Sequence, residues 1–549
     1  MKSIKSALLI ATAFGSAALL SGCKETAEDG AAETTASAAP EIRGDADVEL
    51  SPDMSKLSNP ELAAIFQHID DNIDQHVLNL QNWIRQPSIS NTGEGIQESA
   101  EMVKGFFDQL GCQQTQVYDV GETKWGSQGN PVVYANCDEG AEKTIVIYWM
   151  YDTMPVTQPD LWKAPPFEAR LVEQEPYKKV LIGRGATNSK GPQMAMWNAL
   201  MSIKEVTGTL PVNIVVVAEG DEERMSIGYN EFVTSHPELF EGVDAMYRFS
   251  GQGAGGGTSI TGGSEGCLFV ELITSGESWG RGPVRSNIHG GNKRSVDAPA
   301  WRHIMMLSKL VSPDGNTVLI PGFYDDMRPL TPGQVDALKA MSSGFDPAAA
   351  ADALGVARFI SEDPYEIVRM ARMGTSMNLD GIWGGNMFEG GSGAILPNRI
   401  VSKHNFRYVP DMTGPDITAK LRAYLDDLGY EDVEINVVGD VPFAEISSDS
   451  EYHLAARDAL TAMGLSVAEP SSVEAILGGY WPAYLFSGTE TDIDIPIVTG
   501  MAGLGGNAHA ANEFYVIEGA GKAYGMAGAE KSVAAVLYAM GGKMSVPGE

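Results

Sequence analysis

Four short segments of this chain carry the residue types that hydrolytic chemistry uses. They contain Asp152, the loop at residues 183–191, the adjacent Glu222 and Glu223, and His509. A carboxylate can act as a general base, and a carboxylate beside an imidazole can hold a divalent ion. Each segment alone is a weak signal, because paired glutamates usually lie on a solvated face and a lone histidine usually packs or caps. Their meaning depends on whether the fold brings them together.

Hydrophobic patterning places these segments at one edge of a predicted sheet. Apolar runs at 144–149, 213–218 and 496–499 are rich in Ile and Val, which is typical of buried parallel strands. Helical patterns alternate with these runs, at residues 60–86, 96–110, 191–206 and 450–463. The alternation predicts an α/β fold, in which ligand-bearing residues lie just beyond the carboxyl ends of the strands. Three of the four segments follow a predicted strand, and the fourth opens the helix at 191.

Composition excludes some other functions. The 549 residues allow three to four domains of about 150 residues each. The formal net charge of −34 would repel phosphate backbones, so no nucleic-acid partner is expected. The glycine-rich stretch at 251–257 does not open a helix, which argues against a dinucleotide site. Cys112, Cys137 and Cys267 lack metal-ligand spacing, and we expect all three to be buried thiols.

The N-terminus has the pattern of an export signal. Residues 1–23 combine a basic start with a short apolar run and end in Leu-Ser-Gly-Cys, which resembles a bacterial lipoprotein signal. The resemblance implies that Cys23 is lipidated and becomes the mature N-terminus; plain secretion with a free cysteine is the alternative. Residues 24–58 are polar and predict a flexible tether. We therefore expect a protein of the cell envelope, held by lipid alone at the periplasmic face, with Lys24 favouring the outer membrane.

From about residue 60 to residue 540 the chain resembles the dinuclear-zinc family of aminoacylases, carnosinases and glutamate carboxypeptidases. The resemblance rests on five motifs: Trp-Lys-Ala-Pro-Pro-Phe at 162–167, the Gly-Arg-Gly loop at 183–185, Ile-Pro-Gly-Phe-Tyr-Asp at 320–325, Arg-Tyr-Val-Pro at 407–410 and Ala-His-Ala-Ala-Asn-Glu at 508–513. It implies an α/β catalytic domain with a central mixed sheet, formed by residues 59–265 and 441–549. A smaller α+β lid domain at 266–440 would interrupt it and mediate a homodimer.

Part of the family's catalytic set is retained. Carried over by motif, Asp152 is the orienting aspartate and Glu222 is the general base. Glu223 and His509 match the private ligands of one of the two zinc ions. The resemblance therefore implies an amidohydrolase with at least one part of its metal site intact.

The other part of the set is changed. The first histidine ligand is replaced by Met150, the bridging aspartate by Asn188, and the later aspartate falls near 249–251, where no carboxylate occurs. A thioether is a poor zinc ligand beside oxygen and nitrogen donors. A two-metal site is therefore not expected. Glu223, His509 and Asn188 could bind one zinc or other divalent ion, or the site binds no metal.

Further matches concern the substrate. Arg407 matches an arginine that pairs with a substrate carboxylate, for which a guanidinium is suited; a surface ion pair is the alternative. His289 matches a lid histidine that reaches the partner subunit's active site. Gly478 and Gly479 match a glycine-rich substrate loop. The expected substrate is a small peptide, above all a dipeptide, or an N-acyl amino acid.

Three functions remain open at this point. The first is a hydrolase of peptide or amide bonds that uses Glu222 as general base with at most one metal. The second is a metal-free amidohydrolase or acyl-transfer enzyme. The third is a catalytically inactive peptide-binding lipoprotein of the periplasm. The survival of Glu222 and Asp152 beside the altered ligands favours an enzyme.

Overall fold

The structure is a computed structural model that describes residues 53, 55–57, 59–249, 251, 257–390, 392–467 and 479–544. By its contacts the chain divides into two units, Met1–Glu41 and Ile42–Glu549. The predicted signal, most of the predicted tether, Cys23 and Gly478 lie outside the described residues. Every helix in the described ranges is too short or too polar to span a bilayer.

A six-stranded mixed sheet forms the centre of the larger unit. Its strand order is β1 (Gln114–Tyr118), β2 (Val132–Cys137), β6 (Asn213–Glu219), β3 (Thr144–Met150), β7 (Ala245–Tyr247) and β16 (Ile497–Val498). Strands β6, β3, β7 and β16 run parallel, while β1 and β2 are antiparallel to their neighbours. The three predicted strands are β3, β6 and β16, so the prediction of an α/β fold with a central mixed sheet is confirmed.

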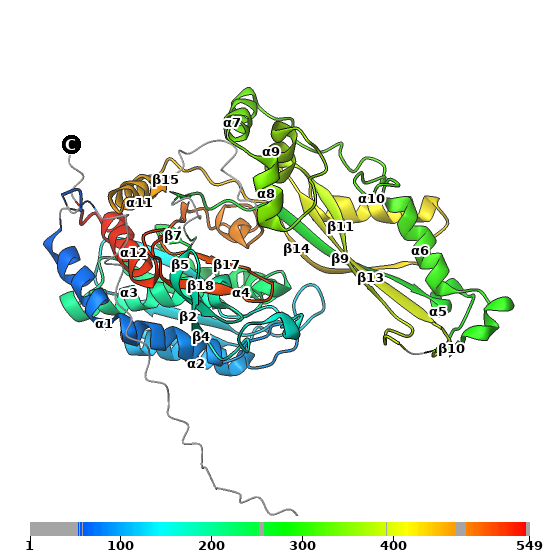
Figure 1. Cartoon of the computed structure of the whole chain (residues 1–549), viewed down its shortest axis with the longest axis horizontal. Helices are drawn as coiled ribbons and strands as arrows, with labels where there is room; N and C mark the ends of the chain where they lie inside the picture. The colour runs from blue at the N-terminus through cyan, green and yellow to red at the C-terminus, as the bar shows by residue number, and fades with distance from the viewer. Residues whose placement is uncertain are drawn as a thin grey trace, which may run out of the picture. The chain divides into compact units, whose positions relative to one another are not determined.

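Helices cover this sheet (Figure 1), and most of them pack against one another. They include α1 (Pro60–Arg85), α2 (Ile96–Leu110), α3 (Gly191–Thr207), α4 (Ile227–Ser235), α11 (Glu451–Ala462) and α12 (Met526–Met540). The helix α1 starts where the sequence predicts, because the Asn59 side chain accepts a hydrogen bond from the N–H of Glu61. The four predicted helices α1, α2, α3 and α11 are thus confirmed.

A second sheet positions two of the four segments predicted to carry chemistry. Its order is β17 (Gly505–Gly506), β18 (Phe514–Glu518), β5 (Tyr177–Ile182) and β4 (Arg170–Gln174), all antiparallel. Ile182 pairs with Phe514. The loop that follows β5 and the loop that precedes β18 therefore leave the sheet side by side.

Residues 266–441 carry a third sheet with its own hydrophobic core. Its order is β11 (Ser376–Trp383), β13 (Arg399–Tyr408), β9 (Gly266–Ser275) and β14 (Glu434–Val441), all antiparallel. The helices of this stretch are α5 (Gly276–Trp279), α6 (Pro299–Leu310), α7 (Pro332–Ser342), α8 (Pro347–Leu354), α9 (Pro364–Met373) and α10 (Gly414–Asp427). Two short pairs complete the strands, β10 (Ile288–His289) with β12 (Ile395–Leu396) and β8 (Gly257–Thr258) with β15 (Ser466–Val467). The role of residues 266–440 as a lid and dimerisation domain stays a prediction.

The cysteines differ from expectation. Cys112 and Cys137 form a disulfide, and only Cys267 is a buried thiol among the described cysteines. The prediction of three thiols is wrong because β1 pairs antiparallel with β2, with Gln114 opposite Asn136. This register brings the two cysteines together across a separation of 25 residues, which the sequence alone does not signal.

Candidate active site

The two glutamates of the third segment lie on a turn that Asp152 holds in place. Strands β3 and β6 run parallel with Met150 opposite Glu219, so the residues after each strand meet at one sheet edge. The buried Asp152 carboxylate accepts hydrogen bonds from the backbone N–H groups of Glu222 (3.3 Å) and Glu223 (3.0 Å). Asp152 therefore positions the Glu222-Glu223 turn. It does so although Met150 stands where a histidine ligand was expected.

The three predicted metal ligands converge. Glu223 Oε1 lies 3.1 Å from His509 Nε2. The Asn188 amide nitrogen donates to Glu223 Oε1 at 2.8 Å and lies 2.9 Å from His509 Nε2. Its amide oxygen accepts a hydrogen bond from Ser189 Oγ at 2.9 Å. A carboxylate, an imidazole and an amide thus face one another within hydrogen-bond distance.

Glu513 organises the loop that carries Asn188, and the sequence analysis missed this role. Its buried carboxylate binds the Arg184 guanidinium at 2.7 Å. It also accepts from the backbone N–H groups of Gly185, Thr187 and Asn188 at 2.9–3.0 Å. Its place as the last residue of the Ala-His-Ala-Ala-Asn-Glu motif, directly before β18, is the signal that could have identified it.

A divalent ion at this site would need Glu223, His509 and the amide oxygen of Asn188 as donors. Within the described ranges no group of three or more His, Cys, Asp or Glu side chains could hold a metal, and Asn188 directs its amide nitrogen rather than its oxygen toward Glu223 and His509. On the other side of Asn188 lies the buried Met150, whose sulfur accepts a hydrogen bond from Ser189 Oγ at 3.4 Å. That side offers a thioether and a hydroxyl, which do not make a site for a second dication.

Three acid groups lie close together at the site, with Asp152 buried and Glu222 and Glu223 partly buried. Burial and the neighbouring Glu223 carboxylate raise the pKa of Glu222 to about 8. Burial and Glu513 raise the pKa of Glu223 to about 8, and burial with both glutamates raises that of Asp152 well above its usual value. Arg248, His509 and Arg407, in this order, lower the pKa of Glu222. A positive charge added at the site would therefore lower the raised pKa values of these carboxyl groups.

Arg407 approaches the site from β13. Its Nη1 forms an ion pair with Glu265 Oε1 at 2.8 Å, and its guanidinium lies 4.6 Å from the centre of the Tyr480 ring. The backbone N–H of Glu265 donates to the carbonyl of Gly479 at 3.2 Å. Arg407 and Gly479 are thus linked through Glu265, and the charge of Arg407 lowers the pKa of Glu222.

His289 is not brought to these residues in the single chain. It lies on β10 with an exposed side chain, and in the described ranges its Nδ1 accepts a hydrogen bond from the N–H of Gly291 at 3.1 Å. Its predicted reach into a partner subunit stays a prediction.

Arg248 is a second residue that the sequence analysis missed. It follows β7 directly, and its guanidinium lies 4.7 Å from the centre of the Trp481 ring, 5.4 Å from Phe249 and 6.0 Å from Tyr148. No motif marked it, because a single arginine at the end of an apolar run resembles any surface charge.

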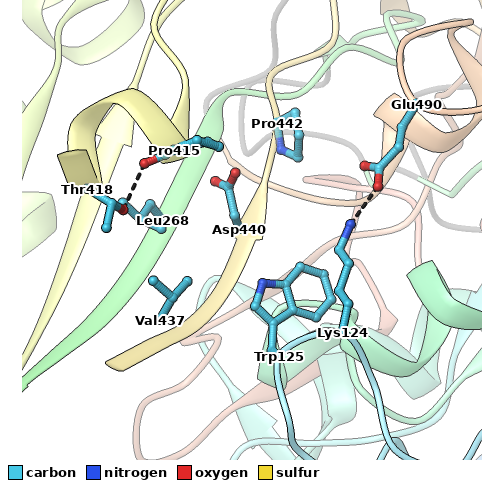
Figure 2. A pocket seen from close by; sticks show the side chains of 10 residues that line it. Lys124, Trp125, Leu268, Pro415, Thr418, Val437, Asp440, Pro442 and Glu490 are labelled. Atoms are coloured by element: carbon cyan, nitrogen blue, oxygen red, sulfur yellow. Dashed lines mark hydrogen bonds and ion pairs between the residues drawn. The ribbon is translucent and has the colours of Figure 1, made fainter. Parts of the chain in front are cut away.

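A separate cavity of about 300 Å³ lies at the junction of β14 with the central part of the chain. Figure 2 shows Trp125, Asp440 and Glu490 around it, with Lys124 reaching Glu490 at 2.5 Å. Asp440 accepts a hydrogen bond from the Tyr408 hydroxyl at 2.7 Å. The charged groups that line the cavity are therefore already paired or hydrogen-bonded. None of the candidate catalytic residues lines it.

Comparison with protein families and sequences gives a consistent result. The model of peptidase family M20/M25/M40 matches residues 149–527. The Cys-Gly metallodipeptidase of Candida albicans is 28% identical over 386 residues, which cover 68% of this chain and 75% of that protein. The human Beta-Ala-His dipeptidase is 26% identical over 423 residues, which cover 73% of this chain and 80% of that protein.

Solved structures match over most of the chain. An M20 family metallo-carboxypeptidase from Sulfolobus solfataricus superposes with a TM-score of 0.69 at 28% identity, covering 84% of this chain and 99% of that chain. Human carnosine dipeptidase 1 gives a TM-score of 0.73, covering 88% and 100% of the two chains. At 23% identity the second likeness concerns the fold alone.

Proposed function

Since this chain belongs to peptidase family M20/M25/M40 and is a hydrolase of that family, we propose that it hydrolyses the peptide bond of dipeptides, with Glu222 as general base and at most one divalent ion. The resemblance drawn from its motifs is confirmed at the level of the family. The observation that carries the proposal is the Glu222-Glu223 turn, held by Asp152 beside Asn188 and His509. The names of the relatives, which are dipeptidases, support the substrate class.

In the proposed reaction the residues of this chain move the protons. The Glu222 carboxylate takes a proton from a water molecule as the water oxygen bonds to the peptide carbonyl carbon. Glu222 then gives that proton to the leaving nitrogen as the carbon–nitrogen bond breaks, which yields a carboxylic acid and an amine. A divalent ion at Glu223, His509 and Asn188 would polarise the carbonyl or the attacking water.

We propose that Arg407 binds the free carboxylate of the substrate. Replacing Arg407 with alanine should lower kcat/KM for a dipeptide about 10–100-fold, mainly through KM, because a charged hydrogen bond contributes about 1.5–3 kcal/mol. The same dipeptide with an amidated C-terminus should show a much smaller difference between parent and variant. Lys403→Ala, which removes a cation from the same strand, is the matched control. Equal losses on both substrates would show that Arg407 acts only through its ion pair with Glu265.

A metal-free hydrolase or acyl-transfer enzyme is the second candidate, and one contact favours it. The Asn188 amide nitrogen already donates to Glu223 and lies against His509. These contacts give the Glu223 carboxylate and the His509 imidazole a partner that a metal ion would otherwise provide. If neither hydrolysis nor acyl transfer is found in a broad screen of dipeptides and N-acyl amino acids, the inactive binding protein becomes the better account.

We propose further that the protein is a lipid-anchored protein of the bacterial cell envelope. The Cys112–Cys137 disulfide supports this, since disulfides persist in oxidising compartments. Cys23→Ser should move the protein from the membrane fraction to the soluble periplasmic fraction, because lipid on this thiol is the proposed anchor. Cell fractionation with immunoblotting measures the change, and Cys267→Ser is the matched control. A variant that stays with the membranes after a salt wash would contradict the anchor.

A further inference from the structure

We propose that Arg248 is a catalytic residue, whose guanidinium stabilises the negative charge that develops on the carbonyl oxygen during hydrolysis. In this role it replaces the positive charge of the ion whose private ligands are missing. The inference rests on the proposed peptide hydrolysis and adds to it the residue that acts on the reacting oxygen.

The position of Arg248 in the sheet places it at the reacting edge. Strand β7 runs parallel to β3 with Ile147 opposite Tyr247. Arg248 follows the last paired residue at the carboxyl end of β7, and the same register sets it opposite Tyr148, two residues before β3 ends at Met150. The backbone N–H of Arg248 donates to the carbonyl of Val498 on β16 at 2.9 Å, which fixes the residue from the other side.

The surroundings of the Arg248 guanidinium leave its charge and one of its donors available to a ligand. It lies over the Trp481, Phe249 and Tyr148 rings, which hold a cation without neutralising it. Its Nε is buried and has no hydrogen-bond partner among the described residues. A buried donor is costly to leave unpaired, so an oxygen acceptor from the substrate would recover a hydrogen bond that the protein does not supply.

Three other cations of the site each have an acidic or a carbonyl partner, although Nε and Nη2 of Arg184 are also buried without a hydrogen-bond partner among the described residues. Arg184 binds Glu513, Arg407 binds Glu265, and Lys190 donates to backbone carbonyls. The charges of Arg248 and Glu222 act on each other, and Arg248 forms no ion pair among the described residues. The proposal places the attacked carbonyl between this cation and the general base. A guanidinium keeps its charge even when buried, so it can serve in place of a metal ion.

The step balances without an additional reactant. As the water oxygen bonds to the carbonyl carbon and Glu222 takes the proton, the carbonyl π electrons move to the oxygen beside Arg248. They return to re-form the double bond when the carbon–nitrogen bond breaks and the nitrogen receives the proton from Glu222. Arg248 binds the oxygen more strongly in the charged intermediate than in the substrate, which is the condition for a gain in kcat.

The test compares Arg248→Ala and Arg248→Lys with the full-length parent in detergent, using a dipeptide that the parent hydrolyses. Arg248→Ala should lower kcat about 10²–10³-fold with little change in KM, as expected for loss of one donor to an oxyanion. Methylguanidinium should restore part of the activity of Arg248→Ala, because it fits the vacated space between the rings, whereas methylammonium should not. Arg248→Lys should be intermediate. Arg369→Met, which removes a surface arginine, controls for net charge.

A binding measurement separates this inference from the proposed function. A phosphinic dipeptide analogue, which carries tetrahedral oxygens, should bind Arg248→Ala far more weakly than the parent in calorimetry, with unchanged melting temperature and metal content. A ketomethylene analogue should bind both equally. Activity and phosphinate affinity within threefold of the parent, or a loss confined to KM, would overturn the inference and leave the hydrolase intact. A parent that hydrolyses no dipeptide would reject the proposed hydrolase and the catalytic role of Arg248 together, whether or not it binds the phosphinate.

Discussion

Replacing Glu222 with glutamine is expected to lower kcat for a dipeptide about 10²–10⁴-fold while leaving substrate binding nearly unchanged. Glutamine keeps the size and polarity of the side chain but cannot accept the proton of the attacking water. The turn should persist, because Asp152 binds its backbone N–H groups rather than the Glu222 side chain. Steady-state kinetics gives kcat, and calorimetry with the phosphinic analogue gives the affinity.

The matched control is Glu231→Gln on α4, which removes a glutamate from the adjoining helix without touching the turn. This control should keep full activity. If Glu222→Gln retains the activity of the parent, proton transfer occurs elsewhere in the site, and Ser189 is the next residue to test. If both variants lose activity together, the loss reflects the fold rather than the base.

Glu513→Ala is expected to lower the free energy of unfolding by about 3–5 kcal/mol, the cost of breaking a buried ion pair from one side. The change leaves the Arg184 guanidinium buried and unpaired and removes the acceptor of three backbone N–H groups. Because Asn188 lies on this loop, activity should also fall. Denaturant unfolding followed by tryptophan fluorescence measures the stability.

Glu173→Ala, an exposed position on β4 of the same sheet, is the control and should change stability by less than about 0.5 kcal/mol. A loss below about 1 kcal/mol for Glu513→Ala would show that water replaces the carboxylate in the loop. In that case Glu513 would not be the residue that organises the Asn188 loop.

The parts of the fold that local patterns determine could be predicted from the sequence. The strand Thr144–Met150 is a continuous apolar run, and α1 combines an Asn59 cap with a regular apolar face. The sheet that joins β5 to β18 could not be predicted in this way, because its strands are short and more than 300 residues apart. The Cys112–Cys137 disulfide depends on the same kind of distant pairing, through the register of β1 with β2.

Some residues of the candidate site could likewise be predicted from local patterns, and others could not. Strand ends and family motifs pointed to Asp152, Glu222 and Glu223, and these lie together as expected. Arg248 and Glu513 were missed because their importance comes from what surrounds them. One is enclosed by aromatic rings from three parts of the chain, and the other by backbone N–H groups of a distant loop. The orientation of the Asn188 amide also depends on hydrogen bonds that only the folded chain defines.

We propose a peptidase site that is altered so that it works with no more than one metal ion, and metal analysis of the active protein tests this most directly. The protein should be dialysed against zinc, separated from free ion, and divided between elemental analysis and a dipeptide hydrolysis assay. We predict hydrolysis with at most one tightly held divalent ion per chain, and loss of that ion in His509→Ala. Two tightly held ions per chain in the active protein would contradict the account.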